Sequence, residues 1–341
     1  MGEIQLQGTL LPIREASCVV FAVRFLDIGC HLRNQSTAIM SAFSPEEWTD
    51  VVPVPQDDGP DPVVAIAYNP EFRMLMDYFR AMLKSQEYSQ RALMLTQAIL
   101  QQNAANYTVW QYRRDCLQSL SADLNAELDY VDGFAEDNPK TYQIWNHRRE
   151  IVGCLQDASR ELAFTEKVFS VDAKNYHAWA HRQWALKTFS LWDGEIEFVE
   201  ALLQDDIRNN SAWNQRWFVV HNGQVGGATE RTQPAPAVCA AEIAFAWNAL
   251  QKARNNESVW NYLRGWAMAY PALQPGIREN CDALVAGSEG GNSLAVGLCA
   301  DLWELEGSEA GREKAAGCFA LLMDIDKIRA KSWRARFEAL S

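Results

Sequence analysis

The sequence lacks any grouping of cysteine and histidine that is typical of a metal site. Its eight cysteines include no CxxC pair, and none lies near a histidine pair with zinc spacing. Separate cysteines of this kind are typical of reduced thiols in a cytoplasmic protein. We therefore expect no metal site in this chain and a cytoplasmic location.

Positive charge and long apolar runs are also scarce. The 341 residues carry 44 acids and 31 bases, which gives a formal net charge of −13. This balance argues against binding to the phosphate backbone of nucleic acids, so an anionic ligand would need a local basic cluster. The apolar run within Ala16–Cys30 is too short to cross a bilayer, and no clean cleavage site follows it. We expect neither nucleic-acid binding nor membrane insertion.

What the sequence does contain is one phrase repeated along the chain. Each copy centres on a tryptophan, and the copies are NYTVWQYRR (106–114), TYQIWNHRR (141–149), NYHAWAHRQ (175–183), NNSAWNQRW (209–217) and NESVWNYLR (256–264). The tryptophans are 35, 34, 34 and 47 residues apart. Two antiparallel helices and their turns occupy about 34 residues, so the period predicts an all-α stack of helical hairpins.

The remaining segments divide the chain into three parts. Residues 1–45 match nothing else in the chain and form an extension of uncertain structure, whereas the proline-rich residues 46–70 predict an extended arm. The hairpin repeats are expected over residues 71–341. A Gly/Pro/Thr-rich loop at Gly223–Pro236 accounts for the longest interval, and weak repeats are expected near Leu294 and around Arg329–Arg336.

The residues around each tryptophan predict how a repeat is built. Four residues before the tryptophan stand side chains that can cap a helix start, namely Asn106, Thr141, Asn175, Asn209 and Asn256. Arginine follows three or four residues after the tryptophan and therefore shares its helical face. We expect the tryptophan to fill the seam between hairpins and the arginine to pair with an acid or carbonyl of the next repeat.

Three basic residues stand at the expected tips of the central repeats. Lys140, Lys174 and Arg208 each lie five residues before a tryptophan, next to a helix N-terminus with its exposed amides. Spacing alone fits a phosphate-sized anion site and a solvated basic rim equally well.

From about Trp48 to the C-terminal IRAKSW, the sequence resembles a known family. It is similar to the alpha subunit shared by protein farnesyltransferase and protein geranylgeranyltransferase type I, whose prenyltransferase alpha repeats carry the phrase N-Y-x-x-W-x-x-R-R. The most specific segments are the arm PVPQDDGPDPVV and the repeat segments AANYTVW, DAKNYHAWAHRQW and RNNSAWNQR.

The resemblance implies a right-handed solenoid of antiparallel helical hairpins wrapped around a beta subunit. It implies a heterodimer, active only as such, in which the beta subunit holds zinc and most of the lipid pocket, with magnesium as a second cofactor. A farnesyl or geranylgeranyl group would pass from an isoprenoid diphosphate to the cysteine of a C-terminal CaaX sequence in the acceptor protein.

The resemblance also assigns residues. Lys140 matches the family's lysine in a P-K-x-Y-Q segment and would stabilise the diphosphate as it leaves, whereas Gln143 matches a glutamine that receives the C-terminal carboxylate of the peptide. The other matching positions line the active-site mouth or face the peptide in that family, and the role of Lys174 is the least defined. These positions are Tyr107, Tyr142, Tyr176, His177 and Lys174. Thr141 and Asp61 depart from the family's asparagines, but threonine can cap, so Lys140 and Gln143 should keep their placement.

Two other functions compete with this one. One is the alpha subunit of the Rab-specific geranylgeranyltransferase, which the PVPQDDGPDPVV arm fits less well. The other is a scaffold of the tetratricopeptide type without catalytic activity. That family has glycine four residues after the tryptophan, whereas this chain has Arg114, Arg149 and Arg264 there in three of the five repeats.

Overall fold

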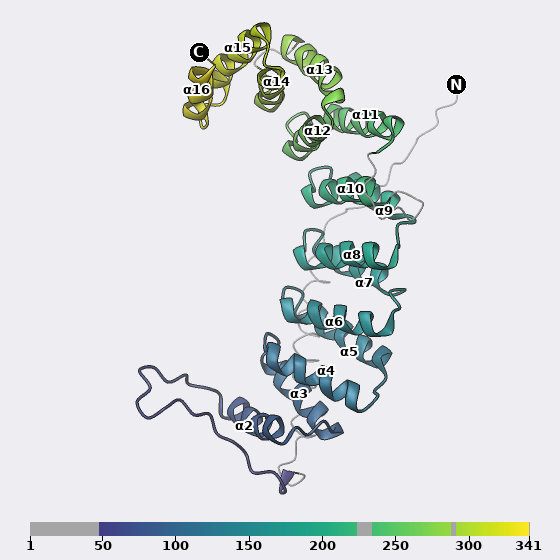
Figure 1. Ribbon diagram of the computed structural model, residues 1–341, viewed down its shortest axis with the longest axis vertical. Coiled ribbons are helices and arrows are strands. Elements are labelled where there is room, and N and C mark those ends of the chain that lie inside the picture. Colours follow the sequence, from purple (N-terminus) through teal and green to yellow (C-terminus); the bar gives the residue numbers. More distant parts are fainter. Residues whose placement is uncertain (1–47, 224–233, 288–290, 341) are drawn as a thin grey trace, which may run out of the picture. The chain divides into compact units, whose positions relative to one another are not determined.

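The described part of the chain is built from helices (Figure 1). The computed structural model describes residues 48–223, 234–287 and 291–340, and these ranges contain helices and no β-strand. The all-α prediction is therefore confirmed. The expected extension over residues 1–45 and residues 224–233 of the expected loop lie outside the described residues. The chain divides into two compact units, Met1–Gln156 and Asp157–Ser341.

In the first unit, an extended segment leads into a series of helices. These helices are α2 (Pro70–Ser85), α3 (Gln90–Gln102), α4 (Tyr107–Ser119), α5 (Leu124–Asp137) and α6 (Tyr142–Leu155). Residues 51–69 contain neither helix nor strand, and most of them are exposed. Two hydrogen bonds fasten their beginning to α2: the amide of Val54 donates to the carbonyl of Asp77 (3.0 Å), and Nε of Arg80 donates to the carbonyl of Val54 (2.8 Å). This segment is thus an arm attached to the first helix.

The second unit continues the helical series. Its helices are α7 (Glu161–Val171), α8 (Tyr176–Phe189), α9 (Glu195–Asp205), α10 (Asn210–Asn222), α11 (Pro236–Lys252), α12 (Glu257–Ala269), α13 (Gln274–Gly287), α14 (Ser293–Glu306), α15 (Glu309–Ile325) and α16 (Ala330–Ala339), with a 3₁₀ turn at Pro271–Leu273. Helices α14 and α16 occupy the two places where weak repeats were expected.

Within each unit, successive helices pair, and the pairs pack on one another. Contacts join α3 to α4, α5 to α6 and α4 to α6 in the first unit. In the second unit they join α7 to α8, α9 to α10 and α11 to α12, and they run from α8 through α10 and α12 to α14. The helices that carry the repeated phrase therefore contact one another in order within each unit (Figure 1).

The tryptophan of each repeat is buried and fixes the turn before its own helix. In all five repeats the indole Nε1 donates to the carbonyl six residues earlier, at 2.7–3.0 Å. The ring fills the space between helices while its polar edge is satisfied locally, as a buried indole requires. The tryptophan therefore packs the seam, as the sequence predicted, and it also shapes the helix start.

Asparagine caps four of the five helices that carry the repeated phrase. The side chains of Asn106, Asn175, Asn209 and Asn256 accept hydrogen bonds from first-turn amides. Thr141 occupies the cap position of α6, but its side chain makes no capping hydrogen bond. The expectation that threonine would cap was wrong, and α6 starts there with Trp145 Nε1 bonded to the carbonyl of Pro139 (2.9 Å).

A buried glutamate accepts hydrogen bonds from two consecutive repeats. We call Glu127, Glu195 and Glu242 the junction glutamates. Each lies in the first helix of a hairpin, and each accepts two or three hydrogen bonds from an arginine of the preceding repeat: Arg113 to Glu127 (2.6–2.7 Å), Arg182 to Glu195 (2.7–3.0 Å) and Arg216 to Glu242 (2.6–2.8 Å). The expected pairing of arginine with an acid of the next repeat is confirmed for these three residues.

The second partner of each junction glutamate comes from its own repeat. The residue 20 positions later contacts the carboxylate at 2.7–2.8 Å, and it is His147 for Glu127, Gln215 for Glu195 and Tyr262 for Glu242. Burial by itself would raise the pKa of Glu127, but hydrogen bonds from His147 and Arg113 outweigh it and lower that pKa. The Glu127 carboxylate is therefore held ionised between two hairpins.

Replacing Glu195 with glutamine should strongly destabilise the second unit. Glu195 is 1 % exposed, and removing its charge leaves the buried guanidinium of Arg182 with only the more distant carboxylate of Glu166, at 3.4 Å. Breaking a buried pair in this way costs about 3–5 kcal/mol. Urea unfolding followed by circular dichroism measures the loss. Glu197→Gln, an exposed acid on the same helix α9, is the control and should stay within about 0.5 kcal/mol of the parent; equal effects of the two substitutions would contradict the role of Glu195.

Replacing His147 with glutamine should make the protein lose less stability in mild acid. Burial lowers the pKa of His147, so the folded chain keeps this ring neutral while the unfolded chain takes up a proton below about pH 6.5. The folded state therefore carries no penalty from His147 above about pH 6.5, and the free energy of unfolding decreases as the pH falls from there toward the folded-state pKa of this ring. Glutamine already holds the equivalent place at Gln215. Melting temperatures measured between about pH 7.5 and 5.5 should fall less steeply for His147→Gln, and parallel curves would rule the explanation out.

Candidate functional site

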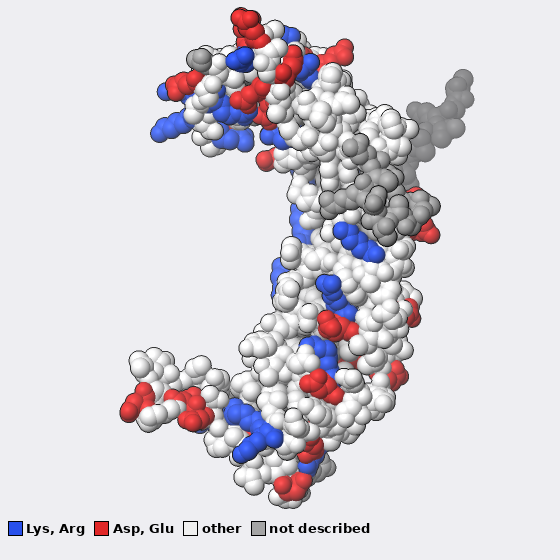
Figure 2. All heavy atoms as spheres, in the orientation of Figure 1, with Lys and Arg blue, Asp and Glu red and all other residues white. Residues whose placement is uncertain are grey.

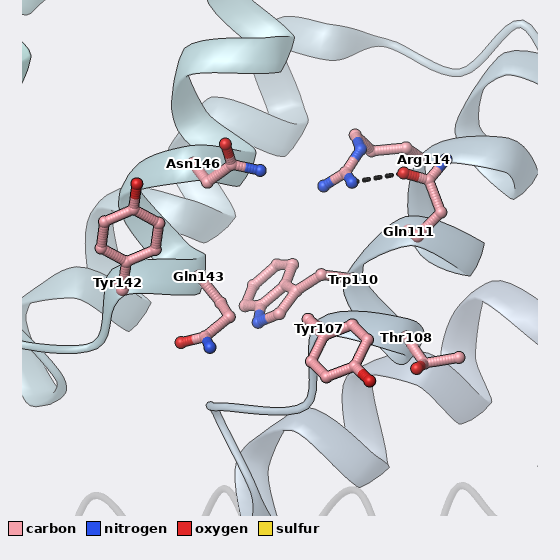
Figure 3. Close-up of a pocket in the computed structure, with 8 residues that line it drawn as sticks. All are labelled: Tyr107, Thr108, Trp110, Gln111, Arg114, Tyr142, Gln143 and Asn146. Atoms are coloured by element: carbon pink, nitrogen blue, oxygen red, sulfur yellow. Dashed lines mark hydrogen bonds between the residues drawn. The ribbon is translucent and has the colours of Figure 1, made fainter.

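An open hollow lies between α4 and α6 of the first unit (Figure 3). Its volume is about 640 Å³. The side chains that line it come from the two phrase-bearing helices: Tyr107, Thr108, Trp110, Gln111, Arg114, Tyr142, Gln143 and Asn146. It is therefore formed by two consecutive copies of the repeated phrase.

Helical spacing explains why these residues meet. Tyr107, Gln111 and Arg114 are four and three positions apart, so they follow one face of α4. Gln143 and Asn146 are three positions apart on the first turns of α6. Because α4 and α6 contact each other, these two faces enclose one space, with the buried ring of Trp110 between them.

The hollow collects three of the residues predicted from the sequence. Tyr107 and Tyr142 are 76 % and 66 % exposed, which is unusual for large aromatic side chains, and Gln143 is half-buried between them. Sequence reasoning missed Thr108, Gln111 and Asn146 and assigned Arg114 only to packing. The i, i+3 and i+4 spacing from Tyr107 and Gln143 was the signal that could have added them.

Arg114 departs from the pairing expected for the repeat arginines. Its Nη2 donates to Oε1 of Gln111 (2.6 Å), and its Nη1 lies 3.4 Å from Nδ1 of His147. Gln111 in turn donates from Nε2 to the carboxylate of Asp115 (2.9 Å), which fixes the orientation of its amide. Burial lowers the pKa of the Arg114 guanidinium from its usual value. The guanidinium is thus positioned by two neutral side chains.

Lys140 lies at the start of α6 and does not line the hollow. It is exposed and stands two residues before Tyr142, the first residue of α6. The backbone around it is fixed by two hydrogen bonds, from Trp145 Nε1 to the carbonyl of Pro139 (2.9 Å) and from the amide of Thr141 to the carbonyl of Asn138 (3.1 Å). The structure therefore places Lys140 at the positive end of a helix, next to Tyr142 and Gln143 in the chain.

The other predicted residues lie together at the start of α8 in the second unit. Tyr176 is 75 % exposed, and its ring centroid lies 5.6 Å from that of His177. The side chain of Lys174 is exposed, and its Nζ lies 3.4 Å from the carboxylate of Asp206. Such an exposed pair contributes little to stability.

On the face drawn in Figure 2 and among the remaining described side chains, no basic field or metal-binding cluster marks a second site. Figure 2 shows acidic and basic side chains interspersed over the drawn face of each unit, without a broad basic field. Among the described residues, no three His, Cys, Asp or Glu side chains are grouped so that they could hold a metal ion. No described helix has both the length and the apolar character needed to span a membrane. The six described cysteines are free thiols.

Comparison with known proteins identifies the repeats. The family described as "Protein prenyltransferase alpha subunit repeat" matches residues 89–120, 124–155, 158–189 and 192–223. Each match covers one pair of helices, from α3–α4 to α9–α10.

Two relatives of the same name match this chain over different lengths. A protein farnesyltransferase/geranylgeranyltransferase type-1 subunit alpha from Dictyostelium discoideum is 38% identical over 312 residues, which covers 86% of this chain and 92% of the relative. The Arabidopsis thaliana protein of the same name is 57% identical over 91 residues, and this match spans only 28% of the relative.

A solved structure agrees with these relatives. A chain of the Candida albicans protein geranylgeranyltransferase-I complexed with GGPP superposes with a TM-score of 0.76 at 27% identity, covering 86% of this chain and 98% of that one. Because the similarity to the Dictyostelium protein extends over nearly the whole of both sequences, this chain belongs to the protein prenyltransferase alpha-subunit family, among the farnesyltransferase/geranylgeranyltransferase type-1 alpha subunits.

Proposed function

We propose that this chain is the alpha subunit of a heterodimeric CaaX protein prenyltransferase. The enzyme transfers a farnesyl or geranylgeranyl group from an isoprenoid diphosphate to the cysteine of a C-terminal CaaX sequence, and it is active only when a beta subunit is present. The observation that carries this proposal is the similarity to the Dictyostelium alpha subunit over 92% of that protein. The exposed aromatic and amide side chains of the hollow give this chain a surface suited to a peptide.

Lys140 is the residue we assign to the leaving group. Negative charge accumulates on the diphosphate as its bond to the isoprenoid breaks, so a fixed ammonium there stabilises the transition state more than the ground state. The exposed side chain stands at the N-terminus of α6, where the helix dipole also favours an anion.

The remaining predicted residues are assigned to the peptide and the mouth of the active site. Gln143 receives the C-terminal carboxylate of the acceptor peptide, and Tyr107 and Tyr142 provide contact surface around it. At the start of α8, Tyr176 and His177 line the mouth. Lys174 adds positive charge beside them, although Asp206 partly offsets it.

The metals of the proposed enzyme would not be held by this chain. The described residues do not fit a zinc or magnesium site, because no three potential ligands are grouped among them. We therefore assign zinc to the beta subunit, and we assign magnesium to the complete enzyme rather than to these residues. A cytoplasmic location follows from the same proposal.

The alternatives have less support. A geranylgeranyl transferase type-2 subunit alpha from Saccharomyces cerevisiae is 36% identical, but the match covers only 83 residues and 25% of that protein. A scaffold of the tetratricopeptide type does not account for the full-length similarity to a type-1 alpha subunit.

Coexpression with candidate beta subunits tests the proposal. The purified pair should transfer labelled farnesyl or geranylgeranyl to a peptide ending in a CaaX sequence, and the chain alone should not. Failure to form a complex with any type-1 or farnesyltransferase beta subunit would refute the proposal, as would a stable complex without transfer.

Replacing Lys140 with alanine in the heterodimer should slow the chemical step. Loss of one preorganised electrostatic contact to developing charge typically lowers the rate by roughly 100-fold or more. Single-turnover transfer measures this step, and peptide affinity should change little. Lys84→Ala, an exposed lysine near the end of α2, is the control and should leave the rate unchanged. An unaltered single-turnover rate in Lys140→Ala would remove Lys140 from the mechanism.

A further inference from the structure

Two adjacent arginines of α4 have opposite surroundings. Arg113 is buried and donates two hydrogen bonds to the carboxylate of Glu127. Arg114, the next residue, lines the hollow, and it makes no ion pair with an acid in the described part of the chain. An arginine side chain stays charged at any physiological pH. The hollow therefore contains a cation that no carboxylate of the described residues contacts.

Neutral side chains hold the Arg114 guanidinium in place. Gln111 accepts from Nη2 at 2.6 Å, and the ring of His147 lies 3.4 Å from Nη1. His147 is itself fixed, because its Nε2 contacts the junction glutamate Glu127 at 2.8 Å. Asp115 and Glu150 lie close enough to act on Arg114 electrostatically, but neither is in contact with it. A charged group held this way is preorganised for a ligand from outside the chain.

The other side chains of the hollow indicate the chemistry of that ligand. None of the eight described residues that line it carries a carboxylate, and three of them, Gln111, Gln143 and Asn146, offer carboxamides. Carboxamides both donate and accept, as peptide groups do. Figure 3 shows Arg114 and Asn146 directed toward one another across the space. A diphosphate, which carries several negative charges, would meet only one cation here, whereas a peptide with one carboxylate would match both the charge and the amides.

We propose that Arg114, with Asn146 opposite it, binds a carboxylate of the acceptor peptide and is a further specificity-determining residue of this chain. The inference rests on the proposed function and deepens it. The carboxylate has two possible sources, an acidic side chain of the acceptor or its C-terminus, which Arg114 would then bind together with Gln143. Both would accept hydrogen bonds from the guanidinium, and the experiment below separates them.

The test compares matched acceptor peptides in the alpha–beta heterodimer. One series replaces each acidic side chain of the peptide by its amide, and the other replaces the C-terminal carboxylate by a carboxamide. The parent enzyme should prefer one carboxylate over its amide by roughly 10- to 100-fold in kcat/KM, as expected for a charge-assisted hydrogen bond. Arg114→Gln should abolish that preference, and Arg114→Lys should keep part of it.

The ratio of kcat/KM for the acid peptide to kcat/KM for the amide peptide distinguishes recognition by Arg114 from structural damage. A structural role of Arg114 would lower kcat/KM for both peptides equally and leave their ratio unchanged, which would overturn the inference. Arg312→Gln, an exposed arginine on α15, is the matched control and should keep the parent ratio. A parent enzyme that does not discriminate acid from amide would also overturn it. If no peptide is modified by any heterodimer, the proposed function fails instead, so the two failures are distinguishable.

Discussion

The buried carboxylate at each hairpin junction is the contact on which the repeat structure depends. A glutamate removed from water must be paired and fully hydrogen-bonded, or its burial costs several kcal/mol. Here the arginine comes from the preceding repeat and the second donor from the glutamate's own repeat. Because the acid is satisfied only when both hairpins are in register, the geometry of stacking is fixed along with the charge.

This arrangement also explains how one helix serves both scaffold and surface. In α4, Trp110 and Arg113 are committed to the junction, since the indole closes the preceding turn and the guanidinium reaches Glu127. Tyr107 before them, Gln111 between them and Arg114 after them fall on the side that faces the hollow. The same phrase therefore packs the hairpins with one face and lines the hollow with the other, and consecutive copies form the two sides of the hollow.

The sequence was sufficient for the features that repeat. The buried tryptophans, the asparagine caps and the arginine pairs each depend on residue spacing, and the same spacing recurs in successive copies of the repeat. Thr141 shows the limit of this reasoning, because a residue able to cap does not cap in this structure. The role of Arg114 could not be predicted either, since the repeat places arginine there without telling whether an acid reaches it. That outcome depends on side-chain positions in two neighbouring repeats.

Under the proposed function, the junctions position the hollow and the start of α6 against a substrate that is bound together with a partner chain. A structure of the heterodimer with an unreactive isoprenoid diphosphate analogue and an acceptor peptide tests this most directly. The account predicts that Nζ of Lys140 lies within hydrogen-bonding distance of the diphosphate and that the peptide contacts the hollow between α4 and α6. A complex in which both the hollow and Lys140 face solvent, away from peptide and diphosphate, would contradict it.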